Sequence, residues 1–235
     1  MSQSTSRTES HAFAGVLLDF DGTIIDSTEA IVENWKRVAA ELGVDYREIL
    51  RASHGRRSID VLRELDPTKA NWDYVSAMEA KIPQLSSKPA IEIAGARRLL
   101  EKLTRHSIPH AIVTSGSKAL LDGWLTILQL PRAMTATTAE DVSAGKPDPE
   151  GYRMAKERLL QHRADEGEVL VMEDAPAGVL AGKAAGCKVL AVTTTHTVEQ
   201  LKEAGADWVV LDHRFVGFET STSPGDVCLT FHDLL

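Results

Sequence analysis

The stretch LLDFDGTIIDS, residues 17–27, contains the features that decide the fold. It belongs to an apolar run that predicts a buried strand over Phe13–Phe20. Asp19 and Asp21 lie two residues apart at the end of that run, so in an extended chain their carboxylates point the same way. Open α/β sheets bind ligands at the carboxyl ends of their strands, and Gly22 permits a ligand to approach the backbone closely. We therefore expect both carboxylates in one site rather than in a capped turn at the surface.

The composition is that of an ordinary globular protein. The chain has 235 residues, of which 43% are hydrophobic and 26% charged, which suits one large domain or a core with an insert. The net charge of −8 argues against nucleic-acid and membrane-surface partners, but not against a small anionic ligand. Cys187 and Cys228 form no metal or disulfide pattern. We expect a monomer or weak dimer.

The sequence contains neither a candidate membrane span nor a secretory signal. No apolar run approaches the roughly 20 residues that span a bilayer. The first dozen residues are polar and lack the apolar segment of a secretory signal. We therefore expect a cytoplasmic protein whose residues 1–11 form a disordered tail.

Strand and helix patterns alternate over most of the chain, which predicts an α/β fold with a parallel, Rossmann-like sheet covered on both faces. Further strands are expected at His110–Thr114, Val169–Met172, Lys188–Val192 and Trp208–Leu211, with a weaker candidate at Ala133–Thr135. Residues 28–89 break the alternation, because they show helical patterns only. We predict a catalytic core over 12–27 and 90–235, with 28–89 as a helical cap over the carboxyl edge of the sheet.

Polar groups follow the other predicted strands as well. Hydroxyls and backbone N–H groups at a helix start can bind an anion, although the same residues also cap helices. A lone lysine is usually solvated, so each group is weak evidence by itself. A parallel sheet would nevertheless gather them in one crevice. They are Thr114, Ser115 and Gly116 after one strand, Lys146 in a later loop, and Glu173 and Asp174 after another strand.

This combination of groups suits phosphoryl transfer. Carboxylate oxygens favour Mg²⁺, which takes one or two protein carboxylates and keeps several waters. An aspartate can act as nucleophile and form an aspartyl-phosphate. The hydroxyl and amide groups and the lysine can bind phosphate oxygens as charge shifts in the transition state. A small phosphorylated metabolite is therefore the expected ligand.

The motifs D-x-D-G-T, T-S-G, G-K-P and E-D-A-P-A-G resemble the four-motif signature of the haloacid dehalogenase-like (HAD) hydrolase superfamily. The helical segment after the first motif is similar to its helical-cap (C1) subgroup, and the resemblance covers about residues 12 to 235. More narrowly, SHGRRSID, KIP, VMEDAPAGVLAGKAAGCK and LTFHDLL resemble the branch of glycerol-3-phosphate phosphatase and 2-deoxyglucose-6-phosphate phosphatase.

The resemblance implies a role for each core residue. Asp19 attacks phosphorus and ligates Mg²⁺, while Asp21 acts as acid and then as base, with its main-chain carbonyl also on the metal. A metal-bound carboxylate cannot easily carry a proton, so nucleophile and acid must be different aspartates. Asp174 ligates Mg²⁺ directly, and Glu173 assists it directly or through water. Lys146 neutralises Asp19 and the phosphate.

The resemblance also implies the phosphate site. Ser115 and the Gly116 N–H hold the phosphate, or Thr114 supplies the hydroxyl instead.

Asp21 argues against a dehalogenase or a phosphonate hydrolase, because those reactions have no oxygen leaving group to protonate. Sugar phosphomutases of the β-phosphoglucomutase type typically carry a histidine where this chain has Ile31, which favours a hydrolase.

The cap is expected to select the substrate. A loop with His54, Gly55, Arg56 and Arg57 can swing over the site, because a bidentate arginine suits phosphate. The alternative is a solvated arginine pair at a helix start. Glu79 is a further candidate. The predicted function is a Mg²⁺-dependent phosphatase for a polyol or sugar phosphate. The alternatives are a phosphomutase, a phosphatase for a specialised metabolite, or a non-catalytic phosphometabolite sensor.

Overall fold

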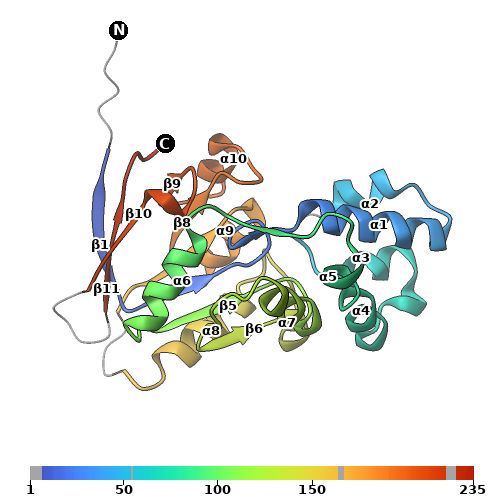
Figure 1. Ribbon diagram of the computed structural model, residues 1–235, viewed down its shortest axis with the longest axis horizontal. Coiled ribbons are helices and arrows are strands. Elements are labelled where there is room, and N and C mark those ends of the chain that lie inside the picture. Colours follow the sequence, from blue (N-terminus) through green and yellow to red (C-terminus); the bar gives the residue numbers. More distant parts are fainter. Residues whose placement is uncertain (1–6, 54, 164–166, 221–225) are drawn as a thin grey trace, which may run out of the picture.

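A six-stranded parallel sheet forms the centre of the protein (Figure 1). The structure is a computed structural model, and it describes residues 7–53, 55–163, 167–220 and 226–235. Its strand order is β6-β5-β2-β7-β8-β9. Leu18 of β2 lies in register with Ile112 of β5 and Met172 of β7, so these strands end at one level. The strands are β2 (Gly15–Leu18), β5 (His110–Val113), β6 (Thr135–Thr137), β7 (Val169–Glu173), β8 (Lys188–Val192) and β9 (Trp208–Val210).

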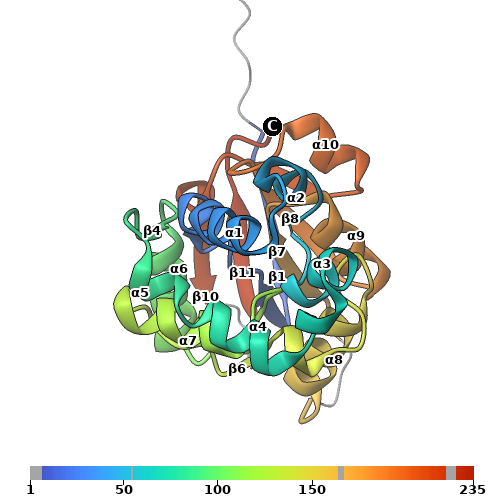
Figure 2. The ribbon, with the colours of Figure 1, turned by 90° about the vertical axis from the view of Figure 1, so that its right-hand side faces the viewer.

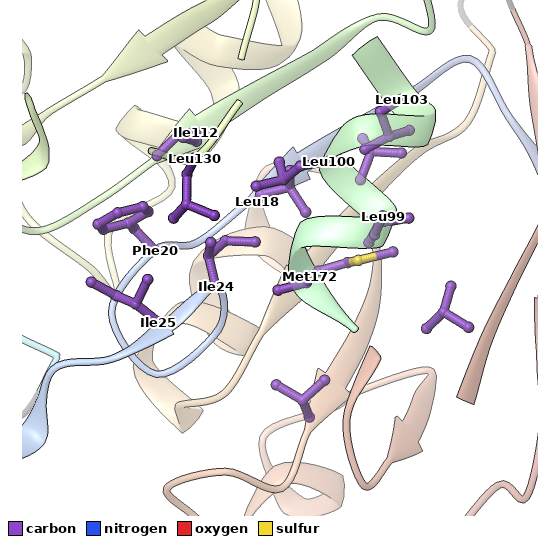
Figure 3. Packing of buried hydrophobic residues seen from close by; sticks show 14 of the residues in the cluster. Leu18, Phe20, Ile24, Ile25, Leu99, Leu100, Leu103, Ile112, Leu130 and Met172 are labelled. Carbon is purple, nitrogen blue, oxygen red and sulfur yellow. The ribbon is translucent and has the colours of Figure 1, made fainter. Parts of the chain in front are cut away.

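Both faces of the sheet are buried, as the continuous apolar strands predict. Leu18 and Met172 pack on one face against Leu99 and Leu103 of α6 (Figure 3). Leu17 points to the opposite face, in the cluster formed with three other helices. The helices of the core are α6 (Ala96–Arg105), α7 (Lys118–Ile127), α8 (Glu150–Leu160), α9 (Pro176–Ala184) and α10 (Val198–Glu203), with short 3₁₀ turns at Ala139–Asp141 and His213–Phe215.

Five helices follow β2 and form a helical insert with a core of its own. Trp35, Val38, Leu62 and Val75 are buried at its centre. Figure 2, viewed from the side of the insert, shows these helices in front of the sheet. They are α1 (Thr28–Leu42), α2 (Tyr46–Ser53), α3 (Ser58–Leu65), α4 (Trp72–Glu79) and α5 (Ile82–Leu85), with a 3₁₀ turn at Pro67–Lys69. The described part of this segment contains no strand.

The chain enters and leaves the insert through two short paired strands. β3 (Ile25–Asp26) and β4 (Ile91–Glu92) run antiparallel, with Ile25 opposite Glu92. The main-chain N–H of Ile93 also donates to the carbonyl of Ile24 at 2.9 Å. The two connections therefore lie side by side, directly after the DGT turn.

The structure contains a three-stranded antiparallel sheet that the sequence analysis did not predict. β1 (Glu9–Phe13) pairs with β11 (Val227–Phe231), which pairs with β10 (Val216–Thr220). The expected disordered tail over residues 1–11 is therefore wrong for residues 9–11, and residues 1–6 lie outside the described ranges. The strand is fixed by distant contacts, because Trp208 Nε1 donates to Glu9 Oε2 at 2.8 Å and Phe13 packs on Phe231. The predicted strand over Phe13–Phe20 is accordingly two strands in two sheets.

The remaining differences from the sequence analysis are small. The weak strand candidate at Ala133–Thr135 begins two residues later, and Thr114 lies just beyond the end of β5. The predicted strands at Val169–Met172, Lys188–Val192 and Trp208–Leu211 match the observed strands to within one residue at either end. No helix within the described ranges is long and apolar enough to cross a membrane.

Candidate active site

One cavity of about 240 Å³ lies between the carboxyl ends of the strands and the helical insert. The ends of β5, β2, β7 and β8 meet here, and β2 is the strand at which the sheet order changes direction. The insert supplies the opposite wall, from α1 to α5. All predicted core residues line the cavity, namely Asp19, Asp21, Thr114, Ser115, Gly116, Lys146, Glu173 and Asp174.

Lys146 bridges two carboxylates inside this cavity. Its Nζ is 2.6 Å from Asp19 Oδ1 and 2.7 Å from Glu173 Oε1, and it stands over the ring of Tyr152. Burial alone would lower the pKa of Lys146, but the two carboxylates outweigh burial and raise that pKa above its ordinary value. The ammonium group therefore stays charged beside Asp19.

Glu173 uses both of its oxygens within the protein. Oε1 accepts hydrogen bonds from Lys146 and, at 2.9 Å, from the Tyr152 hydroxyl. Oε2 accepts from the main-chain N–H groups of Asp174 and Ala175 at 2.9 and 3.0 Å. A carboxylate has about four lone-pair positions, so none is left over. Of the two roles predicted for Glu173, this favours the indirect one. The sequence analysis missed Tyr152, because a tyrosine at helix spacing resembles a core residue.

Asp174 is held by the loops on either side of it. Its Oδ1 accepts a hydrogen bond from Thr23 Oγ1 at 3.2 Å, and its Oδ2 accepts one from the Thr195 hydroxyl. Gly22 packs directly against it with φ of +93°, and a Cβ there would lie 2.3 Å from Asp174 Oδ2. The glycine of the DGT turn is thus required by both backbone angle and close approach. Burial, and then the negative charge of acidic neighbours, raises the pKa of Asp174 well above its ordinary value.

The carboxylates fit a divalent cation. Asp19, Glu173 and Asp174 each have an oxygen within 4.8 Å of the others, although those of Glu173 already accept hydrogen bonds. Asp19 Oδ2 is buried and has no hydrogen-bond partner among the described residues. Burial raises the pKa of Asp19 to about 7, against the lowering effect of Lys146. Counting Asp21 and Glu79, five described carboxylates line the cavity against the cations Lys146 and Arg56, so a hard cation that prefers oxygen would offset the excess negative charge.

The environment of Asp21 differs from that of Asp19. Ser27, at the start of the insert, donates its hydroxyl to Asp21 Oδ1 at 2.5 Å. Burial raises the pKa of Asp21 above its ordinary value, although this hydrogen bond opposes the shift. A raised pKa keeps a carboxyl protonated closer to neutral pH, which suits a general acid.

The three residues predicted to hold phosphate form a short loop between β5 and α7. The Gly116 N–H donates to Thr114 Oγ1 at 2.9 Å, so this hydroxyl points into its own loop. Ser115 Oγ instead donates to the main-chain oxygen of Gly55 in the insert, also at 2.9 Å. Both hydroxyls lie on the cavity wall, so each stays a predicted phosphate ligand.

Arg57 lies differently from the prediction that it touches substrate. It is 4% exposed, does not line the main cavity, and pairs with Asp60 at 2.7 Å. Its other donors contact the core, with Val142 O at 2.6 Å, Ser143 O at 3.0 Å and Ala139 O at 3.4 Å. The guanidinium therefore links the insert to the core loop that contains these three carbonyls.

The other predicted residues of the insert lie nearer the cavity. Arg56 lines it and pairs with Glu64 at 2.6 Å, whereas His54 lies outside the described residues. Glu79 is 3% exposed and lines the cavity. It accepts hydrogen bonds from Ser58 Oγ at 2.5 Å and from the main-chain N–H of Ser117 at 2.7 Å. Burial raises the pKa of Glu79, although both bonds oppose the shift.

The sequence analysis did not identify the cavity wall that α1 provides. Ile31, Val32, Asn34 and Trp35 all line the cavity, and Asn34 is 4% exposed. Trp35 belongs to the core of the insert, and it also borders the cavity. The helix pattern could have signalled Asn34, because an amide beside a buried tryptophan interrupts the apolar face of α1.

Comparisons with known proteins agree with this geometry. Residues 16–192 match the sequence family described as haloacid dehalogenase-like hydrolase. The chain is 36% identical over 228 residues to glycerol-1-phosphate phosphohydrolase 1 of Saccharomyces cerevisiae, covering 93% of this chain and 90% of the relative. It is 39% identical over 212 residues to 2-deoxyglucose-6-phosphate phosphatase 1 of the same yeast, covering 83% and 86%. A crystal structure of a hydrolase from Pseudomonas syringae superposes with a TM-score of 0.68 at 25% identity, covering 85% of this chain and 94% of that one.

Proposed function

Because the chain belongs to the haloacid dehalogenase-like hydrolases, we propose that it is a Mg²⁺-dependent phosphatase that hydrolyses the phosphate monoester of a small polyol or sugar. The observation that carries the proposal is the pairing at the end of β2. Asp19 is paired with Lys146 and has one oxygen without a partner among the described residues, while Asp21 accepts a hydrogen bond from the Ser27 hydroxyl. One carboxylate suits attack on phosphorus and the other suits proton transfer.

The carboxylates of Asp19 and Asp174 and the main-chain carbonyl of Asp21 would hold Mg²⁺. When bound, the cation would neutralise negative charge on the phosphate and on its carboxylate ligands. Glu173 would act mainly through Lys146, since its own oxygens accept hydrogen bonds from the protein.

The reaction would then proceed in two steps on the residues of this chain. In the first, Asp19 attacks phosphorus, the bond from phosphorus to the leaving oxygen breaks, and Asp21 gives that oxygen its proton. In the second, Asp21 takes a proton from water, and the water oxygen attacks the aspartyl-phosphate. Phosphate leaves and the Asp19 carboxylate is restored. Lys146 would hold phosphate oxygens throughout, and the Gly116 N–H would join it on turning from Thr114 Oγ1 to the phosphate.

A phosphate-release assay tests this proposal. The wild-type protein should release phosphate from p-nitrophenyl phosphate and from members of a broad panel of sugar and polyol phosphates, and EDTA should stop the release. Asp19→Asn should abolish it, because an amide cannot form the aspartyl-phosphate. Full activity of Asp19→Asn with Mg²⁺ present would refute the assignment. A product that is an isomeric sugar phosphate, without free phosphate, would identify a mutase instead.

Two further expectations stay predictions from the sequence. These are a cytoplasmic location and a monomeric or weakly dimeric state. Cell fractionation tests the first, and sedimentation analysis tests the second.

A further inference from the structure

Asn34 is a buried polar side chain on the cavity wall without a protein partner. It is 4% exposed, it lines the cavity, and it forms no hydrogen bond to any described residue. Buried amides are almost always hydrogen-bonded, because leaving one unpaired is costly. The partner of Asn34 therefore has to come from the contents of the cavity.

The surroundings of Asn34 are apolar. Ile31, Val32, Trp35 and Leu50 line the cavity together with it. Such a wall accepts the C–H surface of a ligand, while an amide offers both donors and an acceptor. A hydroxyl group both donates and accepts, so it can pair with either the oxygen or the nitrogen of the Asn34 amide.

The position of Asn34 along α1 places it away from the reacting atoms. Ser27, next to the start of the helix, contacts Asp21. Thr28 and Asn34 are six residues apart, which corresponds to about 9 Å along a helix axis. Asn34 therefore lies well along the helix from the end that contacts Asp21, which suits contact with the leaving group rather than with the reacting carboxylates.

Both described cations that line the cavity are already in ion pairs, which disfavours a second phosphate group on the ligand. Among the described lining residues, the cations are Lys146 and Arg56. Lys146 is paired with Asp19 and Glu173, and Arg56 is paired with Glu64. A second phosphate near the insert would therefore have to break an existing ion pair. This favours a leaving group without charge.

We propose that Asn34 recognises a hydroxyl group of an uncharged leaving group and thereby selects polyol and sugar monophosphates. This inference rests on the proposed phosphatase activity, because it concerns the leaving group of that reaction. Asn34 contacts the substrate but takes no part in the chemical steps.

The test compares substrates that differ only in hydroxyl groups. The ratio of kcat/KM is measured for glycerol 1-phosphate over propyl phosphate, and for sorbitol 6-phosphate over hexyl phosphate. Asn34→Leu keeps the shape of the side chain and removes its hydrogen bonds. We expect it to lower at least one ratio about tenfold or more, because a site built to bind a hydroxyl discriminates strongly against its absence. Glu29→Gln, an exposed change on the same helix, is the matched control and should leave both ratios unchanged.

Each alternative outcome is informative. If Asn34→Leu lowers kcat/KM equally for both members of each pair, Asn34 has a structural role only and the proposal is wrong. Unchanged ratios overturn it as well. Asn34→Asp, which keeps the acceptors and loses the amide donors, repeats the measurement if the leucine variant does not fold.

A bisphosphate tests the charge of the leaving group. The wild-type kcat/KM for a hexose 1,6-bisphosphate should be at least about tenfold below that for the hexose 6-phosphate. A preference for the bisphosphate would overturn this part of the proposal. Phosphate release by Asp19→Asn would instead refute the phosphatase mechanism, and it would leave the hydroxyl ratios meaningful. The two failures are therefore distinguishable.

Discussion

Replacing Arg57 with methionine tests whether this arginine has a structural role or binds substrate. The guanidinium forms a bidentate pair with Asp60, at 2.7 and 3.0 Å, and donates to Val142 O and Ser143 O across the insert–core boundary. Methionine keeps most of the aliphatic chain and removes every donor. Breaking a buried ion pair costs about 3–5 kcal/mol. Asp60 keeps Arg63 as a partner, so we expect the lower end, about 3 kcal/mol.

For a chain of this length, such a loss lowers Tm by about 6–12 °C. Thermal unfolding followed by circular dichroism measures it, together with KM and kcat on a phosphate monoester. The control is Arg56→Met, since Arg56 pairs with Glu64 near the surface, where an ion pair contributes about 0–1 kcal/mol. A normal Tm for Arg57→Met with a tenfold higher KM would refute this reasoning. It would show that Arg57 contacts the substrate, as the sequence alone suggested.

Three further predictions concern buried contacts. Tyr152→Phe removes a charge-assisted hydrogen bond to Glu173 and should lower Tm by about 4–8 °C, with a fall in kcat that exceeds any change in KM. Gly178→Ala should lower kcat about 100-fold, because its Cβ would lie 1.7 Å from Glu173 Oε1 and displace the partner of Lys146. His213 is buried and its Nε2–H donates to Thr23 O at 2.8 Å, and burial lowers its pKa from 6.5. The histidine of the unfolded chain therefore takes up a proton at a higher pH than the folded one, so Tm should fall as pH drops below 6.5. The Tm of His213→Gln should fall less steeply.

Matched variants identify the cause in each case. Gly151→Ala, also in a core helix, meets no atom closer than 3.3 Å and should change kcat far less than Gly178→Ala. His106→Gln alters an exposed histidine and is the matched control for His213→Gln. A Tyr152→Phe variant that loses stability but keeps kcat would assign Tyr152 to packing alone. Equal slopes of Tm against pH for wild type and His213→Gln would exclude His213 as the titrating group.

The catalytic side of the site could be predicted because it depends on local rules. A two-residue spacing sets the direction of Asp19 and Asp21, and a parallel sheet brings strand ends to one edge. Only the existence and type of the strands were needed for this step. The same reasoning placed Lys146 and Asp174 in the cavity without any knowledge of helix packing.

The rest depends on contacts between distant segments. β1 is a strand because it pairs with residues more than 200 positions away, and nothing within its own sequence predicts that partner. Arg56 and Arg57 are neighbours with the same chemistry, yet one lines the cavity and the other binds core carbonyls. Their separate environments follow from how the insert docks on the core. The helix pattern shows Asn34 as an interruption of an apolar face, but the cavity that it lines depends on the same docking.

Two contacts between the insert and the core involve the loop that is predicted to hold the phosphate. Ser115 binds Gly55 of the insert, and the main-chain N–H of Ser117 binds Glu79. The wall that carries Asn34 therefore faces the reacting groups only while these contacts hold the insert on the core. A leaving group that bound this wall would favour the same arrangement and would help to exclude bulk water from the site. Recognition of the leaving group should consequently appear in kcat as well as in KM, because part of its binding energy is used to hold the closed site.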